Sequence, residues 1–272
     1  MPQIINTNIQ SLNSQRSLDS SQGALKTALQ RLSSGLRVNS AKDDAAGLAI
    51  AENMNSQSRG MTVAIRNAND GISASQVAEA GYNAIGQHLQ RMRELAVQAA
   101  SGQYDEVNRS ALQAEYDQLS SEIARVVDAT NFNGKKLLDG QFSNVNLQVG
   151  ATTTTESQIA INITSMNVTD VGAITGSVGD NALSAISKLD ELITNVNSNR
   201  AQLGALQSRF EAVLTQLSAA RENTEGARSR IMDADYASET ANLSRAQILQ
   251  QAGVAMLAQA NALPQNVLSL LR

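Results

Sequence analysis

The sequence predicts a mainly α-helical protein in which long helices pack as in coiled coils to form an elongated bundle, with one small β-hairpin in the middle of the chain. Large apolar residues recur every seven residues over long stretches, as in helices paired along narrow seams. Aromatic residues are only 3% of the 272 residues, too few to centre a deep core. Charged residues are 17%, below the roughly 25% of an average soluble chain. This composition suits thin helical packing with small side chains at the contacts.

The first predicted segment, residues 1–40, is a terminal helix whose leucines recur every seven residues at Leu18, Leu25 and Leu32. The order Ser40-Ala41-Lys42-Asp43 has the form of a capping box, in which Ser and Asp satisfy each other's backbone N–H groups. A long helix is therefore expected to begin near Ala41.

The second predicted segment, residues 41–140, contains that long helix and a shorter one. The long helix is expected to end or bend at Ser101-Gly102, and the shorter one to stop at residues 131–134, Asn-Phe-Asn-Gly, because Asn and Gly tolerate turns. Apolar stripes should face a common core. Four glycines are expected weak points of the long helix: Gly60, Gly71, Gly81 and Gly86.

The middle of the chain, residues 141–180, has a different pattern. Apolar and other residues alternate over 145–149 and again over 159–163, with a glycine and a run of threonines between them. Alternation of this kind predicts a β-hairpin with a loose loop.

The last two predicted segments, residues 181–228 and 229–272, return to the helical pattern. The first keeps a seven-residue repeat from Leu189 to Leu217, and the second keeps it through Leu249, Met256, Leu263 and Leu270. Pro264 lacks an N–H and is expected to kink the last helix or to begin a new segment.

Composition and motifs argue against most kinds of chemistry. The net charge of −4 predicts no nucleic-acid binding, the chain has no cysteine, and its one histidine, His88, is expected on a solvated helix face. Asp43-Asp44 and Asp233-Ala234-Asp235 are interpreted as helix caps, since neighbouring helical residues point about 100° apart and rarely share one ion. We therefore expect no enzymatic activity, no cofactor and no metal.

The terminal segments are the most apolar and least charged parts of the chain. Residues 246–271 carry no charge over a length that could cross a bilayer, but seven amides in this stretch argue against membrane insertion. The alternative is a membrane-active secreted helical protein that inserts this terminus. We expect instead that both termini meet and face other copies of the chain. The predicted interface residues are Leu18, Leu25, Leu32, Leu249, Met256, Leu263, Val267 and Leu270.

The same segments resemble bacterial flagellin. Residues 30–51, QRLSSGLRVNSAKDDAAGLAIA, are similar to the amino-terminal segment of that family, and residues 244–272, SRAQILQQAGVAMLAQANALPQNVLSLLR, to its carboxy-terminal segment. Shorter similar stretches are residues 1–15, 89–98, 131–138 and 227–239. Residues 139–181 leave room only for the hairpin and a loop, where many flagellins carry outer domains. The chain therefore resembles a short flagellin.

The resemblance implies a homopolymer of many copies, the extracellular filament of the bacterial flagellum, whose inner tube is lined by the paired chain ends. It also implies an export apparatus of type III, an export chaperone and a filament cap as partners, with subunits secreted unfolded and folded at the distal tip. A long helix with one narrow stripe does not recover the roughly 1–2 kcal/mol of backbone entropy that each residue loses, so we expect the ends to stay mobile until assembly. A hook–filament junction protein of the same family is the alternative.

The resemblance further implies recognition by host flagellin receptors. In similar flagellins, a segment matching residues 89–95 and a glutamate on the next helix form the surface that the vertebrate Toll-like receptor binds. The matching positions here are Gln90, Arg91, Leu95 and Glu115. Arg91 and Leu95 are four residues apart, so they are expected on one helix face, with the guanidinium beside an apolar contact. Residues 30–51 resemble the peptide that the plant flagellin receptor senses.

Overall fold

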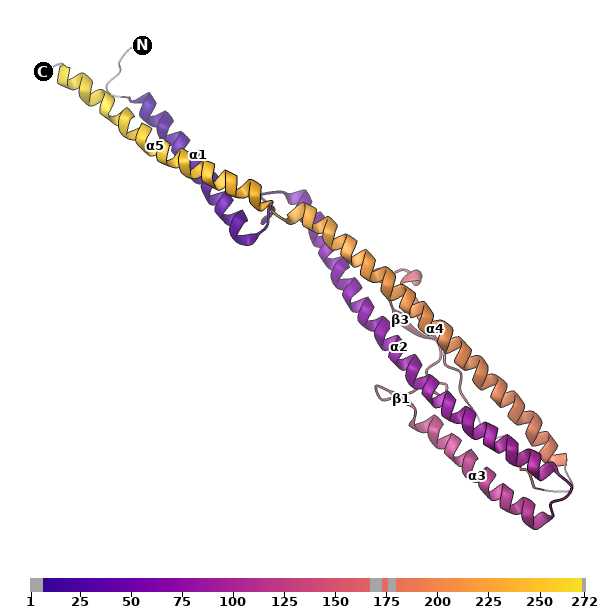
Figure 1. Cartoon of the computed structure of the whole chain (residues 1–272). Helices are drawn as coiled ribbons and strands as arrows, with labels where there is room; N and C mark the ends of the chain where they lie inside the picture. The colour runs from indigo at the N-terminus through magenta and orange to yellow at the C-terminus, as the bar shows by residue number, and fades with distance from the viewer. Residues whose placement is uncertain (1–6, 167–172, 176–179, 271–272) are drawn as a thin grey trace. The chain divides into compact units, whose positions relative to one another are not determined.

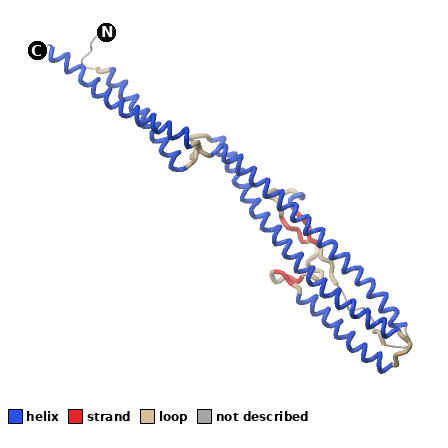
Figure 2. Tube along the Cα trace, viewed as in Figure 1, coloured by secondary structure: helices blue, strands red, loops and turns tan. Residues whose placement is uncertain are grey.

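The computed structural model describes residues 7–166, 173–175 and 180–270, and of residues 180 and 263–270 it describes the backbone alone. The chain divides into two compact units. The helix-pair unit comprises residues 1–56 and 223–272, and the bundle unit comprises residues 57–222. The division falls inside two long helices rather than at the ends of helices. Helices dominate both units, and the strands lie in the bundle unit (Figure 2).

In the helix-pair unit, α1 (Ile9–Ser34) lies beside α5 (Tyr236–Leu270), as Figure 1 shows. The oxygen of Asn8 accepts a hydrogen bond from the backbone N–H of Ser11 and so caps the start of α1. Gly35 ends α1 at a φ of 72°, a left-handed conformation that glycine adopts without strain. The prediction that the two ends of the chain meet is confirmed.

The two connections next to this pair are bonded to each other. Residues Leu36 and Asp233 form a β-bridge, the N–H of Arg37 donates to the carbonyl of Met232 at 2.6 Å, and the N–H of Ala234 donates to the carbonyl of Gly35 at 2.9 Å. A small apolar cluster packs behind them, built from Leu36, Val38, Leu48, Ala51, Ile231 and Met232. The place where α1 leads to α2 and α4 to α5 is thus fixed by backbone hydrogen bonds as well as by packing.

In the bundle unit, α2 (Ala45–Ala100), α3 (Glu106–Ala129) and α4 (Asp180–Met232) run alongside one another (Figure 1). The hairpin of β3 (Val145–Gln148) and β4 (Gln158–Ile161) is antiparallel, with Val145 opposite Ile161, and a short 3-10 turn (Thr155–Ser157) precedes β4. The predicted hairpin is confirmed, as are the ends of α2 and α3. The largest side chains fully buried in this unit include Tyr82, Ile85, Leu89, Met92, Tyr116, Ile123 and Phe210.

A second hairpin was not expected from the sequence. Strands β1 (Asn131–Phe132) and β2 (Lys135–Lys136) are joined by Asn133 and Gly134, whose φ angles are 51° and 77°. Two left-handed residues in a row give the tight turn for which Asn-Gly is the preferred pair. The sequence Asn-Phe-Asn-Gly therefore stops α3 and also reverses the chain.

The start of α2 differs from the prediction. The carboxylate of Asp43 accepts hydrogen bonds from both the backbone N–H and the hydroxyl of Ser40, which closes a turn before the helix rather than its first turn. The helix begins at Ala45, where an oxygen of Asp44 accepts from the N–H of Gly47 at 2.8 Å. The expected start at Ala41 is wrong because the cap is Asp44.

Two long helices continue through residues that were expected to weaken or interrupt them. α2 is continuous through its four glycines, and their role as weak points stays a prediction. Two of them admit a close neighbour: a Cβ at Gly71 would lie 2.8 Å from the Phe210 ring, and one at Gly81 would lie 2.8 Å from Leu138. α5 also passes Pro264 and continues to Leu270, so no new segment begins there. Proline removes one N–H donor, and the rest of the helical ladder persists.

Candidate functional site

The seam between α1 and α5 is made of small and polar side chains. Buried residues along it are Ser11 and Ala28 from α1 and Glu239, Ala246 and Ala260 from α5. Leu18 lies over Gly253, where an added Cβ would come within 3.3 Å of the leucine Cδ1. Such residues let two helices approach closely, but they bury little apolar area. The pair therefore has a narrow interior and a wide outer surface.

Polar contacts hold the outer end of this seam. The amide of Asn8 donates to the carbonyl of Ala260 at 2.7 Å, and the hydroxyl of Ser11 donates to the side-chain oxygen of Asn261 at 2.8 Å. These bonds join residues some 250 positions apart in the sequence. They help to set the register of α1 against α5.

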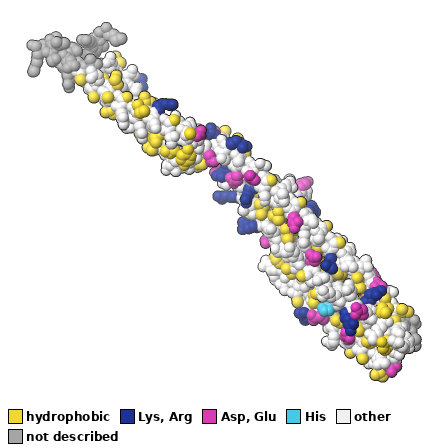
Figure 3. Space-filling view, in the orientation of Figure 1, with side chains coloured by type: hydrophobic (Ala, Val, Ile, Leu, Met, Phe, Trp, Pro, Cys, Tyr) yellow, Lys and Arg dark blue, Asp and Glu magenta, His cyan; other side chains and the backbone are white. Residues whose placement is uncertain are grey.

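Many large apolar side chains of the pair are left open to solvent. Leu249 is 51% exposed and Met256 is 62% exposed, although both belong to the predicted seven-residue repeat. In Figure 3, charged side chains are sparse over the helix pair and denser over the bundle. We define the exposed terminal set as Ile9, Leu12, Leu29, Ile248, Leu249, Val254 and Met256. Its members are candidates for burial against another molecule.

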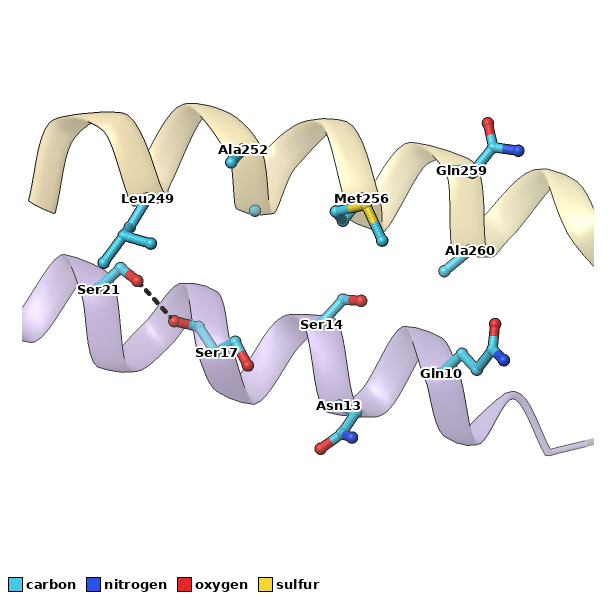
Figure 4. Close-up of a pocket in the computed structure, with 11 residues that line it drawn as sticks. Gln10, Asn13, Ser14, Ser17, Ser21, Leu249, Ala252, Met256, Gln259 and Ala260 are labelled. Carbon is cyan, nitrogen blue, oxygen red and sulfur yellow. Dashed lines mark hydrogen bonds between the residues drawn. The ribbon is translucent and has the colours of Figure 1, made fainter. Parts of the chain in front are cut away.

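A groove of about 530 Å³ runs between the two helices beside this set. Its α5 wall carries Leu249, Ala252 and Met256, and its α1 wall carries serines and amides. Figure 4 shows Leu249 and Met256 pointing toward α1, from which Ser14 and Ser21 point back toward α5. The groove thus has one apolar wall and one hydroxyl-rich wall.

The predicted interface residues are distributed unevenly over this surface. Leu18, Leu25 and Leu32 are half-buried on α1, so part of each leucine packs within the chain. Leu249 and Met256 are exposed. Leu263, Val267 and Leu270 have side chains outside the described residues. The assignment of all eight to contacts between copies stays a prediction.

The residues predicted for receptor recognition lie on α2 and α3. Arg91 donates from Nε to Glu115 at 2.9 Å, and its Nη1 lies 3.0 Å from the carboxylate of Glu94. The hydrogen bond that Arg91 donates to Glu115 is the largest cause that raises the pKa of Arg91. Gln90, Arg91 and Glu115 are all exposed, so they form one polar surface across the two helices.

Leu95 does not belong to that surface. It is 1% exposed and packs in the core of the bundle unit. The expectation of an apolar contact exposed beside Arg91 is wrong, because the four-residue spacing aligns the two Cα positions but the Leu95 side chain turns inward. Leu95 supports the helix that displays Arg91.

The remaining candidates have structural roles. Asp44 caps α2, and Asp235 caps α5 by accepting from the N–H of Ala237 at 2.9 Å. His88 is half-buried and lies near Glu122, whose pKa it helps to lower after the larger effect of Arg125. Within the described part of the chain, no group of three potential ligands could hold a metal, and no helix is apolar and long enough to span a membrane.

Sequence reasoning missed several exposed residues of the helix pair. Ile9, Leu12, Ile248 and Val254 lie off the seven-residue repeat and were not assigned to the interface. A helical projection of both terminal segments together could have found them, since the apolar residues of each exceed what one narrow seam can cover. Glu239 was also missed, although it is the one acidic residue in α5.

Comparison with known proteins gives a consistent result. The family model described as bacterial flagellin N-terminal helical region matches residues 5–143, and that of the C-terminal helical region matches residues 186–271. The chain is 44% identical to a flagellin of Halalkalibacterium halodurans over 99% of this chain and 100% of that protein. It is 41% identical to a flagellin of Bacillus subtilis over 98% of this chain and 99% of the relative.

Two other relatives extend this result. The flagellar filament 33 kDa core protein of Treponema phagedenis is 41% identical over 99% of this chain and 100% of its own length. The crystal structure of Bacillus cereus flagellin is similar to this fold with a TM-score of 0.50 and 27% identity, over 56% of this chain and 88% of that one.

Proposed function

The chain belongs to the bacterial flagellin family and is a structural subunit of the extracellular flagellar filament, and we propose that the exposed terminal set of the α1–α5 pair is the surface through which its copies polymerise. The observation that carries the proposal is the exposure of Leu249 and Met256 on a regular seven-residue repeat. The match at both ends favours the filament subunit over a junction protein. The family is structural, and we infer that the chain catalyses no reaction.

The energetics support polymerisation through this set. Full burial of a large apolar side chain contributes about 1.5–3 kcal/mol, so a half-exposed one gains about 1 kcal/mol when a neighbour covers it. Seven such residues lie on one helix pair with few charges. Because every copy carries the set, the gain repeats at each contact of the polymer.

The weak seam of the pair supports a chain that orders on assembly. Ala, Ser and Gly at the contacts bury too little area to offset the entropy of ordering two long helices. We infer that the subunit leaves the cell unfolded through the type III export apparatus with a chaperone and folds beneath the cap. The lack of cysteine suits this route, since no disulfide can form on the way.

Limited proteolysis of free monomer is expected to trim both ends and leave the bundle unit intact. Ends that resist the protease in verified monomer contradict this inference.

The test of the assembly surface is Met256→Asp, compared with Gln251→Asp on the same helix. Both changes add one charge, but only the first removes apolar surface from the exposed terminal set. Seeded polymerisation followed by light scattering and electron microscopy is expected to fail for Met256→Asp and to proceed for Gln251→Asp. Normal filaments from Met256→Asp protein overturn the assignment.

The exposed group of Gln90, Arg91 and Glu115 supports a second role, recognition by the vertebrate receptor for flagellin. Arg91 spans α2 and α3 through its bond to Glu115, which holds the guanidinium at the surface. The matched control is Arg93, two residues along the same helix, which pairs with Asp190 of α4 instead. Receptor signalling by depolymerised protein is expected to weaken with Arg91→Ala and to remain with Arg93→Ala. Equal potency of the two variants removes Arg91 from the recognised surface.

A further inference from the structure

A second groove of the α1–α5 pair, about 310 Å³, is lined in part by charged side chains. Arg31 and Thr27 line it from α1, and Glu239, Asn242 and Arg245 line it from α5. This is unusual for the pair, because α1 and α5 otherwise carry only Arg16, Asp19 and Lys26 as charged residues. Leu249 lines both grooves, so the second is continuous with the proposed assembly surface.

The charged groups of this groove are incompletely satisfied within one chain. The side chain of Glu239 is 10% exposed, and its carboxylate lies 3.8 Å from Nη1 of Arg31, which is too long for a hydrogen bond. The Nε of Arg31 is buried and has no hydrogen-bond partner among the described residues. Buried polar groups are normally paired, so this arrangement calls for a further partner.

Arg245 gives the groove its net positive charge. In the described residues, the hydrogen bond found for its guanidinium is from Nη1 to the amide oxygen of Asn242, at 3.2 Å. When a neighbour covers Leu249, Arg245 is drawn out of water with it. A cation that loses water is stabilised by a counter-charge, so a carboxylate on the covering surface is the complementary group for Arg245.

We propose that this groove receives the carboxylate of Asp19 from a second copy of the chain, which pairs with Arg245 and Arg31. Asp19 is exposed on α1 and has no ion pair in the part of the chain that the structure describes. It is also the one acidic residue of the two helices besides Glu239. The proposal rests on the assembly surface proposed above and names the polar contact that sets its register.

The geometry of one helix explains why the partner is another copy. Asp19 and Arg31 are twelve residues apart on α1, roughly 18 Å along the helix axis, so Asp19 does not reach Arg31 of its own chain. Although the groove begins at Ser21, Asp19 makes no ion pair with Arg245 in the described residues. A copy displaced by about that distance brings its Asp19 beside the groove. A displacement of this kind uses a different patch on each copy, which makes the contact heterologous, and heterologous contacts build a filament when the rotation between copies does not close.

Charge reversal tests the contact with Arg245→Glu, Asp19→Lys and the two combined. Each single change is expected to raise the critical monomer concentration for seeded polymerisation roughly tenfold or more, since it opposes like charges at every contact. The combined variant is expected to recover most of the loss, because the pair is restored with reversed sign. The loss in the single variants is expected to depend on ionic strength.

Circular dichroism of the monomers is the control for folding, and all three variants are expected to keep the helicity of the unaltered chain. Single variants that polymerise normally, or a combined variant no better than the worse single one, overturn the pairing. Met256→Asp separates the two proposals. If it blocks polymerisation while the charge variants have no effect, the pairing fails and the apolar surface stands; if it polymerises normally, the surface itself fails.

Discussion

α4 and α5 carry the same seven-residue spacing of large apolar side chains, yet the two helices use it differently. In α4, Leu189, Val196, Leu203 and Phe210 are at most 2% exposed. In α5, Leu249 is 51% exposed and Met256 is 62% exposed. The repeat therefore determines that each helix has an apolar face, and the neighbours of that face determine whether a single chain covers it.

The neighbours differ in size. The apolar face of α4 belongs to a core that α2, α3 and the β3–β4 hairpin share, with aromatic rings such as Tyr82 and Phe210 inside it. α5 packs against α1, and the contact between them is built largely from alanine, serine and glycine, with Leu18 of α1 only half-buried against Gly253. The bundle unit thus buries its apolar face within one copy, whereas the helix pair leaves much of its apolar face exposed.

The largest effect is expected from Phe210→Ala in the bundle core. Removal of a fully buried ring leaves a cavity, so the free energy of unfolding of the monomer is expected to fall by about 3–5 kcal/mol. Met256→Ala, the matched change on α5, is expected to alter it by less than about 0.5 kcal/mol. Chemical denaturation of both monomers measures this. A comparable loss in Met256→Ala contradicts the contrast, since it requires that the chain itself bury α5.

Substitution of glycine by alanine is expected to lower stability in the bundle unit and to raise it in the helix pair. At Gly71 a Cβ would lie 2.8 Å from the packed Phe210 ring, so Gly71→Ala is expected to cost about 1–3 kcal/mol of monomer stability. At Gly23 of α1 a Cβ meets nothing within 4 Å, so Gly23→Ala is expected to stabilise its helix by about 0.5–1 kcal/mol. Amide hydrogen-exchange rates, followed separately in α2 and in α1, measure the two effects. Faster exchange in α1 of Gly23→Ala contradicts the second.

These cases show which parts of the fold the sequence predicts. Periodicity predicted the helices and alternation predicted the β3–β4 hairpin, because each reports the local backbone. The start of α2 was misplaced because Ser40-Asp43 and Asp44 offer two competing sets of side-chain hydrogen bonds. The packing role of Gly71 could not be predicted, since Phe210 is far away in the chain.

The candidate site was predicted less completely than the fold, for a related reason. The spacing of Leu249 and Met256 identified the helix face but not which residues α1 would cover. The inward direction of Leu95 depends on the shared core of the bundle unit, which one helix does not reveal. The Arg31–Glu239 contact joins two distant segments and has no local signature. Contacts between helices are therefore the part that requires the structure.

Tyrosine titration gives a smaller effect that is confined to the bundle unit. Burial raises the pKa of Tyr82 and of Tyr116 to about 12, from an ordinary value of 10. Between these values the unfolded chain loses the proton and the folded chain keeps it. The contribution of each buried hydroxyl to the free energy of unfolding is fully present below pH 10 and is lost as the pH rises through about 12.

The corresponding variants are Tyr82→Phe and, as a control, Tyr236→Phe in the exposed start of α5. Tyr82→Phe is expected to flatten the loss of stability in that alkaline range and to cost about 1 kcal/mol at neutral pH, because the hydroxyl donates to the carbonyl of Thr164 at 2.6 Å. Tyr236→Phe is expected to leave the stability at neutral pH unchanged, because its side chain is 57% exposed. Unfolding midpoints across the alkaline range measure both. An unchanged slope in Tyr82→Phe shows that its ring does not govern the transition.

The smallest effect is expected from the surface ion pair that joins α2 to α4. Arg93 and Asp190 lie 2.6 Å apart, but both are half exposed, so water and salt screen their attraction. Arg93→Ala is expected to lower the unfolding midpoint slightly at low ionic strength and not at all at high ionic strength.

The hydrogen bond from Arg93 is the largest cause that lowers the pKa of Asp190. The contribution of the pair is therefore present above the ordinary carboxyl range and is lost as the pH falls through the lowered pKa, so the midpoints of the two proteins should converge in acid. Asp190→Asn in both backgrounds completes a double-mutant cycle, whose coupling is expected to be small. A coupling as large as the loss in Phe210→Ala contradicts this account and makes the ion pair, rather than the shared apolar core, the main difference between α4 and α5.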